Sequence, residues 1–467
     1  MFKKVLVANR GEIACRILGT CERLGIETAA VFSDADVHAP HVAMADEAHR
    51  VGGAQPRESY LDIDAVVAAV VASGADAVHP GYGLLSENSR FAQAVAEAGA
   101  RFIGPSAAAL AELGDKVTAR ALARSVGLKP PPGTAEPVTR ESAAVAALEL
   151  GFPLLVKAAA GGGGIGMHLV NDASELEQAL GVATARAAAA FGDARVYLEK
   201  YLTKPRHIEL QLGRDRHGQS LFLGERECSV QRRHQKIIEE SPSPASFLEA
   251  PEGRVSFEET VERARALLEA AGYENLATVE FVADATGELY FLEVNARLQV
   301  EHPITEMRSG LDLVELQLRI ASGERLPPEL FRASLSGHAI EARVYAEDPT
   351  KNFMPQPGKL AALALPRGEG VRIDAGVREG DEITPYYDPL LLKLVAHGSD
   401  RSQAIARLDQ ALADLVLNIE GKRGPRVTNQ DFLRRVLAAP DFQSGDYDTS
   451  LAATLASRVA PSVAGDS

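Results

Sequence analysis

Polar side chains recur at every second position of the segment YFLEVNARLQVE, which spans Tyr290–Glu301. In an extended strand alternate side chains face opposite sides, so this spacing would gather the polar groups on one face. A strand with one solvated face would show the same pattern, and that simpler interpretation stays open at this point. The polar positions are Glu293, Asn295, Arg297, Gln299 and Glu301.

The preceding segment supplies another carboxylate. Thr278–Val282 predicts a second strand, and a loop at Ala285–Glu288 would join the two strands as a hairpin. In that register Glu280 lies opposite Glu293, which is unfavourable unless a cation lies between the two charges. Oxygen ligands suit Mg²⁺ or Mn²⁺, so we favour a metal site at Glu280, Glu293 and Asn295. The guanidinium, the amide and the further carboxylate that follow would form an anion site with a base.

Length and charge restrict the classes of function. The chain has 467 residues, enough for about three domains. Its 49 basic and 64 acidic residues give a net charge of −15, which argues against binding to nucleic acid or to an anionic membrane. We find no apolar run of roughly 18 residues and no signal-peptide pattern. Cys15, Cys21 and Cys228 form no disulfide or zinc pattern, so we expect core thiols in a reducing cytoplasm.

The first 114 residues alternate between short apolar strands and amphipathic helices, which predicts a doubly wound parallel sheet. Ligands of such sheets bind at the carboxyl ends of the strands, so the loop Pro80–Asn88 is a candidate substrate site. Dinucleotide binding with Asp34 or Asp36 is disfavoured, because the first turn carries only Gly11. The predicted elements are Lys4–Ala8, Glu12–Leu24, Thr28–Phe32, Val66–Ala72, Ala77–His79, Phe91–Ala98 and Phe102–Ile103.

A proline-rich linker at Lys129–Pro137 indicates a domain boundary. Beyond it, Leu154–Val170 predicts a β-hairpin with a glycine-rich tip, followed by a helix at Ser174–Phe191 and a strand at Arg195–Leu202. The tip has no Walker or Rossmann pattern, and it is either a floppy turn or a loop whose N–H groups close on phosphates. Lys157 beside it favours the phosphate interpretation.

Basic residues gather in Gly224–Glu240. A solvated loop would explain them, but we favour an anion site beside the proposed metal. His338–Pro349 predicts an alternating strand that carries Arg343, and the tail Ala456–Ser467 is expected to be disordered. The basic cluster comprises Arg226, Arg232, Arg233, His234 and Lys236.

Long motifs throughout the chain resemble those of biotin carboxylases, members of the ATP-grasp superfamily. The resemblance runs from VANRGEIACRI at Val7–Ile17 to PYYDPLLLKL at Pro385–Leu394, and includes HPGYGLLSEN, KAAAGGGGIGM, SVQRRHQK and EVNARLQVEHPITE. It implies a free subunit or the N-terminal part of an acyl-CoA carboxylase α chain. The implied units are an N-terminal α/β domain (1–114), a connecting helix and linker (115–130), an ATP-grasp lid (131–202) and a C-terminal ATP-grasp and biotin carboxylase domain (203–467).

The resemblance also implies roles for residues at matching positions. Glu301 matches the base that deprotonates bicarbonate, and Arg343 the residue that stabilises enolised biotin. Arg297 and Lys236 complete the catalytic set. The ATP positions are Lys116, Lys157, Gly161, Gly162, Gly163, Gly164, Gly166, Met167, Glu199, Lys200, Leu202, His207, Gln231 and His234. The bicarbonate and biotin positions are Tyr82, Gly83, Lys236, Arg297, Gln299, Val300 and Arg343, and the metal ligands are Glu280, Glu293 and Asn295.

The implied reaction is ATP-dependent carboxylation of biotin through carboxyphosphate, with two Mg²⁺ or Mn²⁺ ions and bicarbonate as substrate. It is the first half-reaction of an acyl-CoA carboxylase, such as that of fatty acid biosynthesis. The implied partners are a biotin carboxyl carrier protein, a carboxyltransferase and a second copy of the chain. Another ATP-grasp carboxylate–amine ligase, or a nucleotide-binding subunit without catalysis, remains an alternative.

Two departures from the family pattern stand out. Ile165 replaces a basic residue of the glycine-rich tip, which often also has a Gly or Ser near Ala160. The segment IEGKRGPRVTN at Ile419–Asn429 is longer than its usual counterpart, and we expect it to lie away from the catalytic motifs.

Overall fold

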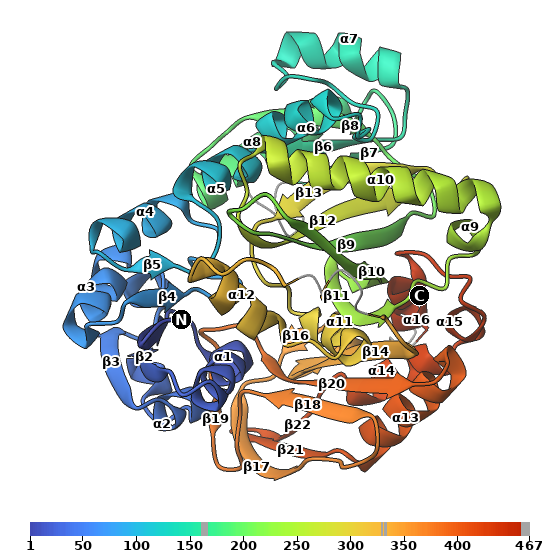
Figure 1. Cartoon of the computed structure of the whole chain (residues 1–467). Helices are drawn as coiled ribbons and strands as arrows, with labels where there is room; N and C mark the ends of the chain where they lie inside the picture. The colour runs from blue at the N-terminus through green and yellow to red at the C-terminus, as the bar shows by residue number, and fades with distance from the viewer. Residues whose placement is uncertain (160–166, 328–329, 331–333, 459–467) are drawn as a thin grey trace.

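The computed structural model describes residues 1–159, 167–327, 330 and 334–458. Figure 1 shows the N-terminal elements in blue on one side, residues 131–202 in teal and green at the top, and the C-terminal elements in orange and red below. A long antiparallel sheet runs through the middle. Helix α10 (Pro251–Ala270) lies across its upper part, next to the strands that carry the predicted metal ligands.

The N-terminal unit is the predicted doubly wound sheet, with parallel strands in the order β3-β2-β1-β4-β5. The order reverses between β1 and β4, and ligands of such sheets bind in the crevice at that point. Strand β3 was not predicted, because half of its residues, EAHRVG, are polar and give no apolar run. The strands are β1 (Lys4–Val7), β2 (Glu27–Ser33), β3 (Glu47–Gly52), β4 (Ala77–His79) and β5 (Arg101–Phe102). The helices are α1 (Gly11–Arg23), α2 (Pro40–Met44), α3 (Ile63–Ser73), α4 (Ser89–Glu97), α5 (Ala107–Gly114) and α6 (Lys116–Ser125).

Residues 131–202, the segment predicted to form a lid and called the lid below, contain in their described part a three-stranded sheet with two helices. The hairpin predicted at Leu154–Val170 is confirmed, because β6 pairs antiparallel with β7 from Leu154 opposite Val170. Alanines and leucines of the helices pack with strand residues into a hydrophobic cluster that contains only lid residues. The lid therefore has a core of its own. Its elements are α7 (Arg140–Leu150), β6 (Leu154–Ala158), β7 (His168–Val170), α8 (Leu176–Phe191) and β8 (Val196–Lys200).

The central sheet has eight antiparallel strands in the order β13-β12-β9-β10-β11-β14-β20-β18. It joins the predicted metal hairpin at one edge to the C-terminal strands at the other. Its strands are β9 (Arg206–Arg214), β10 (Ser220–Arg232), β11 (Gln235–Ser241), β12 (Asn275–Ala283), β13 (Leu289–Asn295), β14 (His338–Tyr345), β18 (Val371–Ala375) and β20 (Leu390–Gly398).

The alternation predicted for His338–Pro349 is wrong. All eight residues of β14 are buried, because the strand is central and helices α11 (His302–Ser309) and α13 (Arg401–Asp414) pack against it. The remaining helices are α9 (Ser246–Glu249), α12 (Leu313–Ala321), α14 (Gln430–Leu437), α15 (Pro440–Ser444) and α16 (Leu451–Ser457). Small sheets are formed by β15 (Glu347–Asp348) with β16 (Met354–Pro355), and by β17 (Gly358–Ala364), β19 (Glu382–Ile383), β21 (Val416–Gly421) and β22 (Gly424–Arg426).

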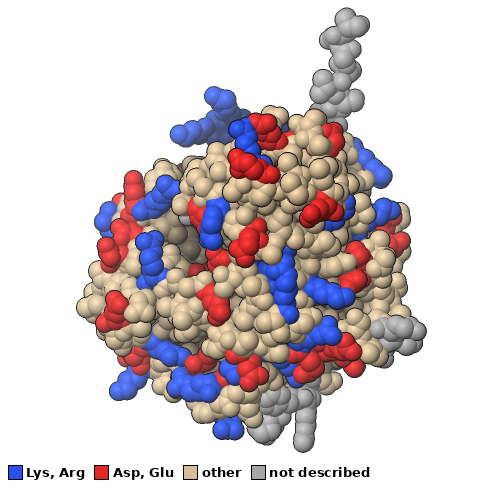
Figure 2. Space-filling view, turned by 90° about the horizontal axis from the view of Figure 1, so that it is seen from above, with Lys and Arg blue, Asp and Glu red and all other residues tan. Residues whose placement is uncertain are grey.

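Other expectations are settled by the same model. All three cysteines are buried free thiols, as predicted. The tail was expected to be disordered from Ala456, but α16 includes Ala456 and Ser457; residues 459–467 lie outside the described part of the chain. Among the described helices, none has the length and apolar character needed to cross a bilayer. Acidic and basic side chains are interspersed over the face in Figure 2.

Candidate active site

The predicted site residues converge on one cavity of about 1070 Å³, bounded by the N-terminal loops, the lid and the central sheet. Glu301 is fully buried behind the cavity wall, and the five glycines of the hairpin tip, with Ala160 and Ile165, lie outside the described residues. The predicted residues that line the cavity are Tyr82, Gly83, Lys116, Lys157, Met167, Glu199, Lys200, Leu202, His207, Gln231, His234, Lys236, Glu280, Glu293, Asn295, Arg297, Gln299, Val300 and Arg343.

The N-terminal sheet contributes to this cavity at the point where its strand order reverses. Asn9 follows β1, and its side-chain amide donates to the carbonyls of Pro80 at 2.7 Å and Tyr82 at 2.8 Å, in the loop after β4. Gly83 has φ of +64°, a conformation that favours glycine. Tyr82, Gly83, Leu84 and Glu87 of the loop Pro80–Asn88 line the cavity, and the binding of a substrate by this loop stays a prediction.

The predicted pairing of Glu280 with Glu293 is confirmed. The loop is one residue longer than expected, since Ala283 pairs with Leu289, and a bulge at Leu292 restores the register. The bulge also breaks the simple alternation of side chains along β13. It lets Phe291 pack in the core while Glu293 lines the cavity, although both have odd numbers.

Beyond Asn295 the prediction of a continuous strand is wrong. Strand β13 ends there, and the chain turns before α11. Arg297 is held by contacts instead of strand alternation: its Nε lies 3.0 Å from Glu87 Oε2, and its Nη1 donates to Gln299 Oε1 at 2.9 Å. The Glu87 carboxylate also accepts from the Ala296 amide. Glu87 was not singled out from the sequence, although it lies within the HPGYGLLSEN motif.

Lys236 is the centre of a buried cluster of charges. Its ammonium lies 2.7 Å from Glu301 Oε1, 2.8 Å from Glu280 Oε1 and 2.6 Å from Glu209 Oε2. Sequence reasoning missed Glu209, although His207 and Glu209 alternate along β9 in a way that could have identified it. The ligand atoms of His207, Glu209 and Glu280 lie within 4.8 Å of one another. Four ionisable side chains from β9, β11, β12 and the turn thus share one buried volume.

Glu301 lies between two cations. The Arg343 guanidinium is 2.9 Å from Glu301 Oε2 and also contacts Glu239 on β11. Burial by itself raises the pKa of the Glu301 carboxyl, but the charges of Lys236 and Arg343 outweigh it and hold this pKa well below its usual range. Glu301 is therefore a carboxylate near neutral pH.

The two lysines predicted to bind phosphate also face the cavity, each beside a carboxylate. Lys116 at the start of α6 lies 3.2 Å from Glu293, and Lys157 on β6 lies 2.8 Å from Glu199. Burial lowers the pKa of the Lys157 ammonium, while the Glu199 carboxylate raises it, and the pKa lies above its ordinary value. An incoming polyphosphate would compete with the carboxylate partners of both lysines.

The basic segment is not a solvated loop, the simpler alternative left open above. Gly224–Glu240 forms β10, a turn at Arg233 and His234, and most of β11. Arg226 is fully buried against Glu209, and Arg232 pairs with Glu347, so these two cations are structural. Only part of the predicted cluster, including His234 and Lys236, faces the cavity.

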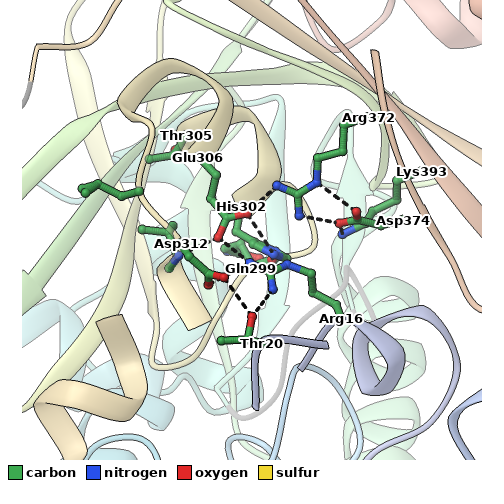
Figure 3. A network of polar contacts seen from close by, with 12 residues as sticks. Arg16, Thr20, Gln299, His302, Thr305, Glu306, Asp312, Arg372, Asp374 and Lys393 are labelled. Atoms are coloured by element: carbon green, nitrogen blue, oxygen red, sulfur yellow. Dashed lines mark hydrogen bonds and ion pairs between the residues drawn. The ribbon is translucent and has the colours of Figure 1, made fainter. Parts of the chain in front are cut away.

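A buried polar network supports the turn from behind (Figure 3). Lys393 on β20 is fully buried and donates to the Val300 carbonyl at 2.8 Å, next to Glu301. The His302 ring donates to the Gln299 carbonyl at 2.8 Å. The network continues through ion pairs between α1, α11 and β18, including Arg16, Glu306 and Arg372. These contacts fix the backbone just before Glu301.

The expectation that 419–429 lies away from the catalytic motifs is wrong at its last residue. Strands β21 and β22 form a hairpin on a separate small sheet, but Asn429 bonds the backbone of Arg343. The described site residues therefore meet around one cavity, which gathers lysine and arginine cations and paired carboxylates.

Three family models match the chain. They are described as Biotin carboxylase, N-terminal domain, over residues 1–110; Carbamoyl-phosphate synthase L chain, ATP binding domain, over 115–329; and Biotin carboxylase C-terminal domain, over 341–454. The biotin carboxylase of Halalkalibacterium halodurans is 47% identical over 451 residues, covering 96% of this chain and 97% of the relative. The mitochondrial propionyl-CoA carboxylase alpha chain of Caenorhabditis briggsae is 46% identical, and the match spans 96% of this chain but only 60% of the relative.

A solved structure agrees with these matches. The biotin carboxylase domain dimer of Hydrogenobacter thermophilus 2-oxoglutarate carboxylase, in complex with MgADP, ADP and bicarbonate, has a TM-score of 0.92 and 40% identity, covering 97% of this chain and 98% of that one. Fold and site define an ATP-grasp ligase, and the chain belongs to the biotin carboxylase family. It is an ATP-dependent enzyme that carboxylates biotin.

Proposed function

We propose that this chain forms carboxybiotin from ATP, bicarbonate and the biotin of a carrier protein, by way of carboxyphosphate, with Glu301 as the base. The observation that carries the proposal is the buried Glu301 carboxylate held between Lys236 at 2.7 Å and Arg343 at 2.9 Å, at the wall of the cavity. A carboxylate there can accept a proton from an anion bound to the neighbouring cations.

Bicarbonate would bind to Lys236, Arg297, Gln299 and the backbone near Val300. As a bound anion it would draw the charge of Lys236 away from Glu301, so the pKa of this carboxyl would rise from its depressed value toward that of a useful base. Glu301 would then take the bicarbonate proton while Lys236 and Arg297 hold the growing negative charge. The activated oxygen would attack the γ-phosphorus of ATP, releasing ADP and leaving carboxyphosphate.

The polyphosphate would replace carboxylates as the partner of the two lysines. Lys116 now lies beside Glu293, and Lys157 beside Glu199. The metal residues fit a divalent cation: Glu280 and Glu293 are in direct register, and each is balanced by a lysine in this structure. Glu280, Glu293 and Asn295 would hold Mg²⁺ or Mn²⁺, which supplies neutralisation of phosphate charge when bound.

The second step would use the other side of Glu301. Carboxyphosphate would break into CO₂ and phosphate, and the phosphate would take the N1′ proton of biotin. Arg343 would stabilise the enolate oxygen as N1′ attacks CO₂, with Tyr82 and Gly83 forming part of the ureido pocket. Because water destroys carboxyphosphate, the lid (131–202) would have to close over the cavity. The separate core of the lid supports movement as one body.

We also propose the larger assembly. The chain would work with a biotin carboxyl carrier and a carboxyltransferase of an acyl-CoA carboxylase, and as a homodimer, since the related Hydrogenobacter thermophilus domain is a dimer. Three buried free thiols suit a reducing compartment, for which we propose the cytoplasm. The division at residues 114, 130 and 202 remains our proposed domain scheme.

The test measures ADP release by the full chain with Mg²⁺, bicarbonate and free biotin. We expect release that depends on bicarbonate and is stimulated by biotin. Glu301→Gln should lower the rate by about 10²- to 10⁴-fold with ATP affinity nearly unchanged, because only the base is lost. Glu420→Gln removes an exposed carboxylate and is the matched control.

Absence of bicarbonate-dependent ADP release from a folded sample would contradict the proposal. Release that requires an amine or another carboxylate, and ignores biotin, would indicate a different ATP-grasp ligase. ATP binding without turnover, even with biotinylated carrier, would indicate a nucleotide-binding subunit.

A further inference from the structure

Asn429 is fully buried and lies 86 residues along the chain from Arg343, yet the two are bonded. The Asn429 amide donates to the Arg343 carbonyl at 2.9 Å, and its side-chain oxygen accepts from the Tyr345 amide at 2.8 Å. The Asn429 backbone N–H donates to the Tyr345 carbonyl at 3.1 Å. One residue thus bonds β14 three times, on both sides of Val344.

These bonds lie where the regular pairing of β14 with its neighbouring strands ends. The register of β14 with β11 ends at Ala342. On its other side, the register with β20 shifts between Val344 and Tyr345. The end of β14 that carries Arg343 is therefore the part of the strand with the fewest regular hydrogen bonds to its neighbours. The Asn429 side-chain amide has a donor and an acceptor group, like a peptide, and supplies hydrogen bonds to the β14 backbone there.

The Asn429 side chain makes these bonds to β14 in place of a helix-capping bond. Asn429 is the N-cap residue of α14, and asparagine is among the side chains preferred at that position because it accepts from the first-turn N–H groups. In the described helix α14, no such bond to the Asn429 side chain forms. The side chain points to β14 instead, so the tertiary contact has displaced the helix cap.

We infer that Asn429 is a positioning residue for Arg343, fixing the strand so that the guanidinium stays against Glu301; this inference rests on the function proposed above. Both residues bonded by Asn429 line the cavity. Arg343 contacts Glu301 at 2.9 Å, so a shift of its backbone would move the group that faces both the base and biotin. The long 419–429 segment, which is otherwise outside the site, thus acts on the site through its last residue.

The test compares the Asn429→Ala variant with the wild-type protein, both as the full chain. We expect the biotin-stimulated rate to fall by about 10- to 100-fold, the effect of a misplacement near 1 Å. ATP affinity should change by less than about 3-fold, and the slow bicarbonate-dependent ADP release without biotin should fall by a smaller factor than the biotin-stimulated rate. Asn418→Ala, an exposed asparagine on β21, is the matched control and should leave all three unchanged.

A double-mutant cycle separates positioning from general damage. In an Arg343→Ala background, Asn429→Ala should add less than about a 2-fold further loss, because the residue it positions has gone. Equal losses in both backgrounds, or equal losses of ATP affinity and biotin-stimulated rate, would overturn the inference. Should the alanine variant not fold, Asn429→Asp keeps the acceptor for Tyr345 and replaces the donor to Arg343 with a carboxylate oxygen, and it should show the same split.

A crystal structure of the variant that folds keeps the two proposals distinguishable. A wild-type chain without bicarbonate-dependent turnover would refute the proposed function alone. In that case displacement of the Arg343 guanidinium from Glu301 in the variant would still support positioning by Asn429, and an unmoved guanidinium would refute it.

Discussion

At the scale of single residues, the site is a set of charges that compensate one another before any substrate binds. Lys236 forms ion pairs with three carboxylates, and Glu301 forms ion pairs with both Lys236 and Arg343. Buried charges are tolerated only when they are paired, so the cations proposed to bind bicarbonate and phosphate form ion pairs in this structure. Substrate binding then exchanges partners within the cavity, with no need to bury a new lone charge.

Replacing Lys236 tests this arrangement. Lys236→Gln should lower bicarbonate-dependent ADP release by about 10²- to 10³-fold, because one preorganised donor to the reacting anion is lost. It should also raise the pKa of Glu301, whose carboxylate loses its nearest cation. Steady-state rates against bicarbonate concentration measure the first effect, and Lys422→Gln, at an exposed lysine, serves as control. A variant with the wild-type bicarbonate dependence would show that Lys236 does not contact the substrate.

Acid sensitivity is expected from a different residue. Burial of the His41 ring lowers its pKa from 6.5 to about 4, so the unfolded state binds this proton more readily than the folded state does. The unfolding free energy should therefore fall as the pH drops from about 6.5 toward 4, by up to about 1.4 kcal/mol per pH unit for this one proton. His41→Gln, which can still donate to the Val31 carbonyl, should flatten that part of the curve in urea titrations at each pH. Identical slopes for both proteins would contradict the assignment.

At the scale of elements, the bulge at Leu292 decides which side chains of β13 enter the cavity. Residues 291 and 293 would share a face in a regular strand, but Phe291 packs in the core and Glu293 faces the lysine of α6. The turn after Asn295 then takes over from the strand, with Glu87, Lys393 and the His302 ring holding it in place.

An insertion tests the importance of this geometry. One alanine inserted between Leu292 and Glu293 should turn Glu293 and Asn295 away from the cavity, because a one-residue slip reverses the faces of a strand. Mg²⁺-dependent ADP release should fall at least about 100-fold, as for loss of a major electrostatic contact. An alanine inserted between Thr286 and Gly287, in the loop at the other end of β13, should be absorbed there and is the control. Equal activities of the two insertions would refute the role of the bulge.

At the scale of the whole molecule, the cavity belongs to no single unit. The crevice of the N-terminal sheet, the lid with its separate core and the edge of the eight-stranded sheet each contribute part of the wall. A ligand that contacts all of them links their stabilities, since binding to the folded state alone raises the free energy of unfolding.

Metal removal should therefore be visible in stability as well as in rate. In the presence of Mg²⁺, ATP at about 100 times its dissociation constant should raise the free energy of unfolding by about 2.7 kcal/mol. EDTA should abolish most of this increase together with ADP release. Added Mg²⁺ or Mn²⁺ in excess should restore both. Denaturant titrations with and without ATP measure the effect, and Glu293→Gln should respond weakly to the metal. Full stabilisation by ATP in EDTA would contradict the metal site.

The sequence by itself determined the parallel N-terminal sheet, the glycine hairpin and the pairing of Glu280 with Glu293, because each depends on local periodicity and turn chemistry. It also identified many of the charged and polar residues of the cavity, where long motifs carried a family resemblance. Only the tertiary structure decided that β13 ends at Asn295, that Arg226 and Arg232 are structural, and that Glu209, Glu87 and Asn429 belong to the site. These residues act through partners distant in the chain, and burial and ion pairing between distant segments leave no periodic trace in the sequence.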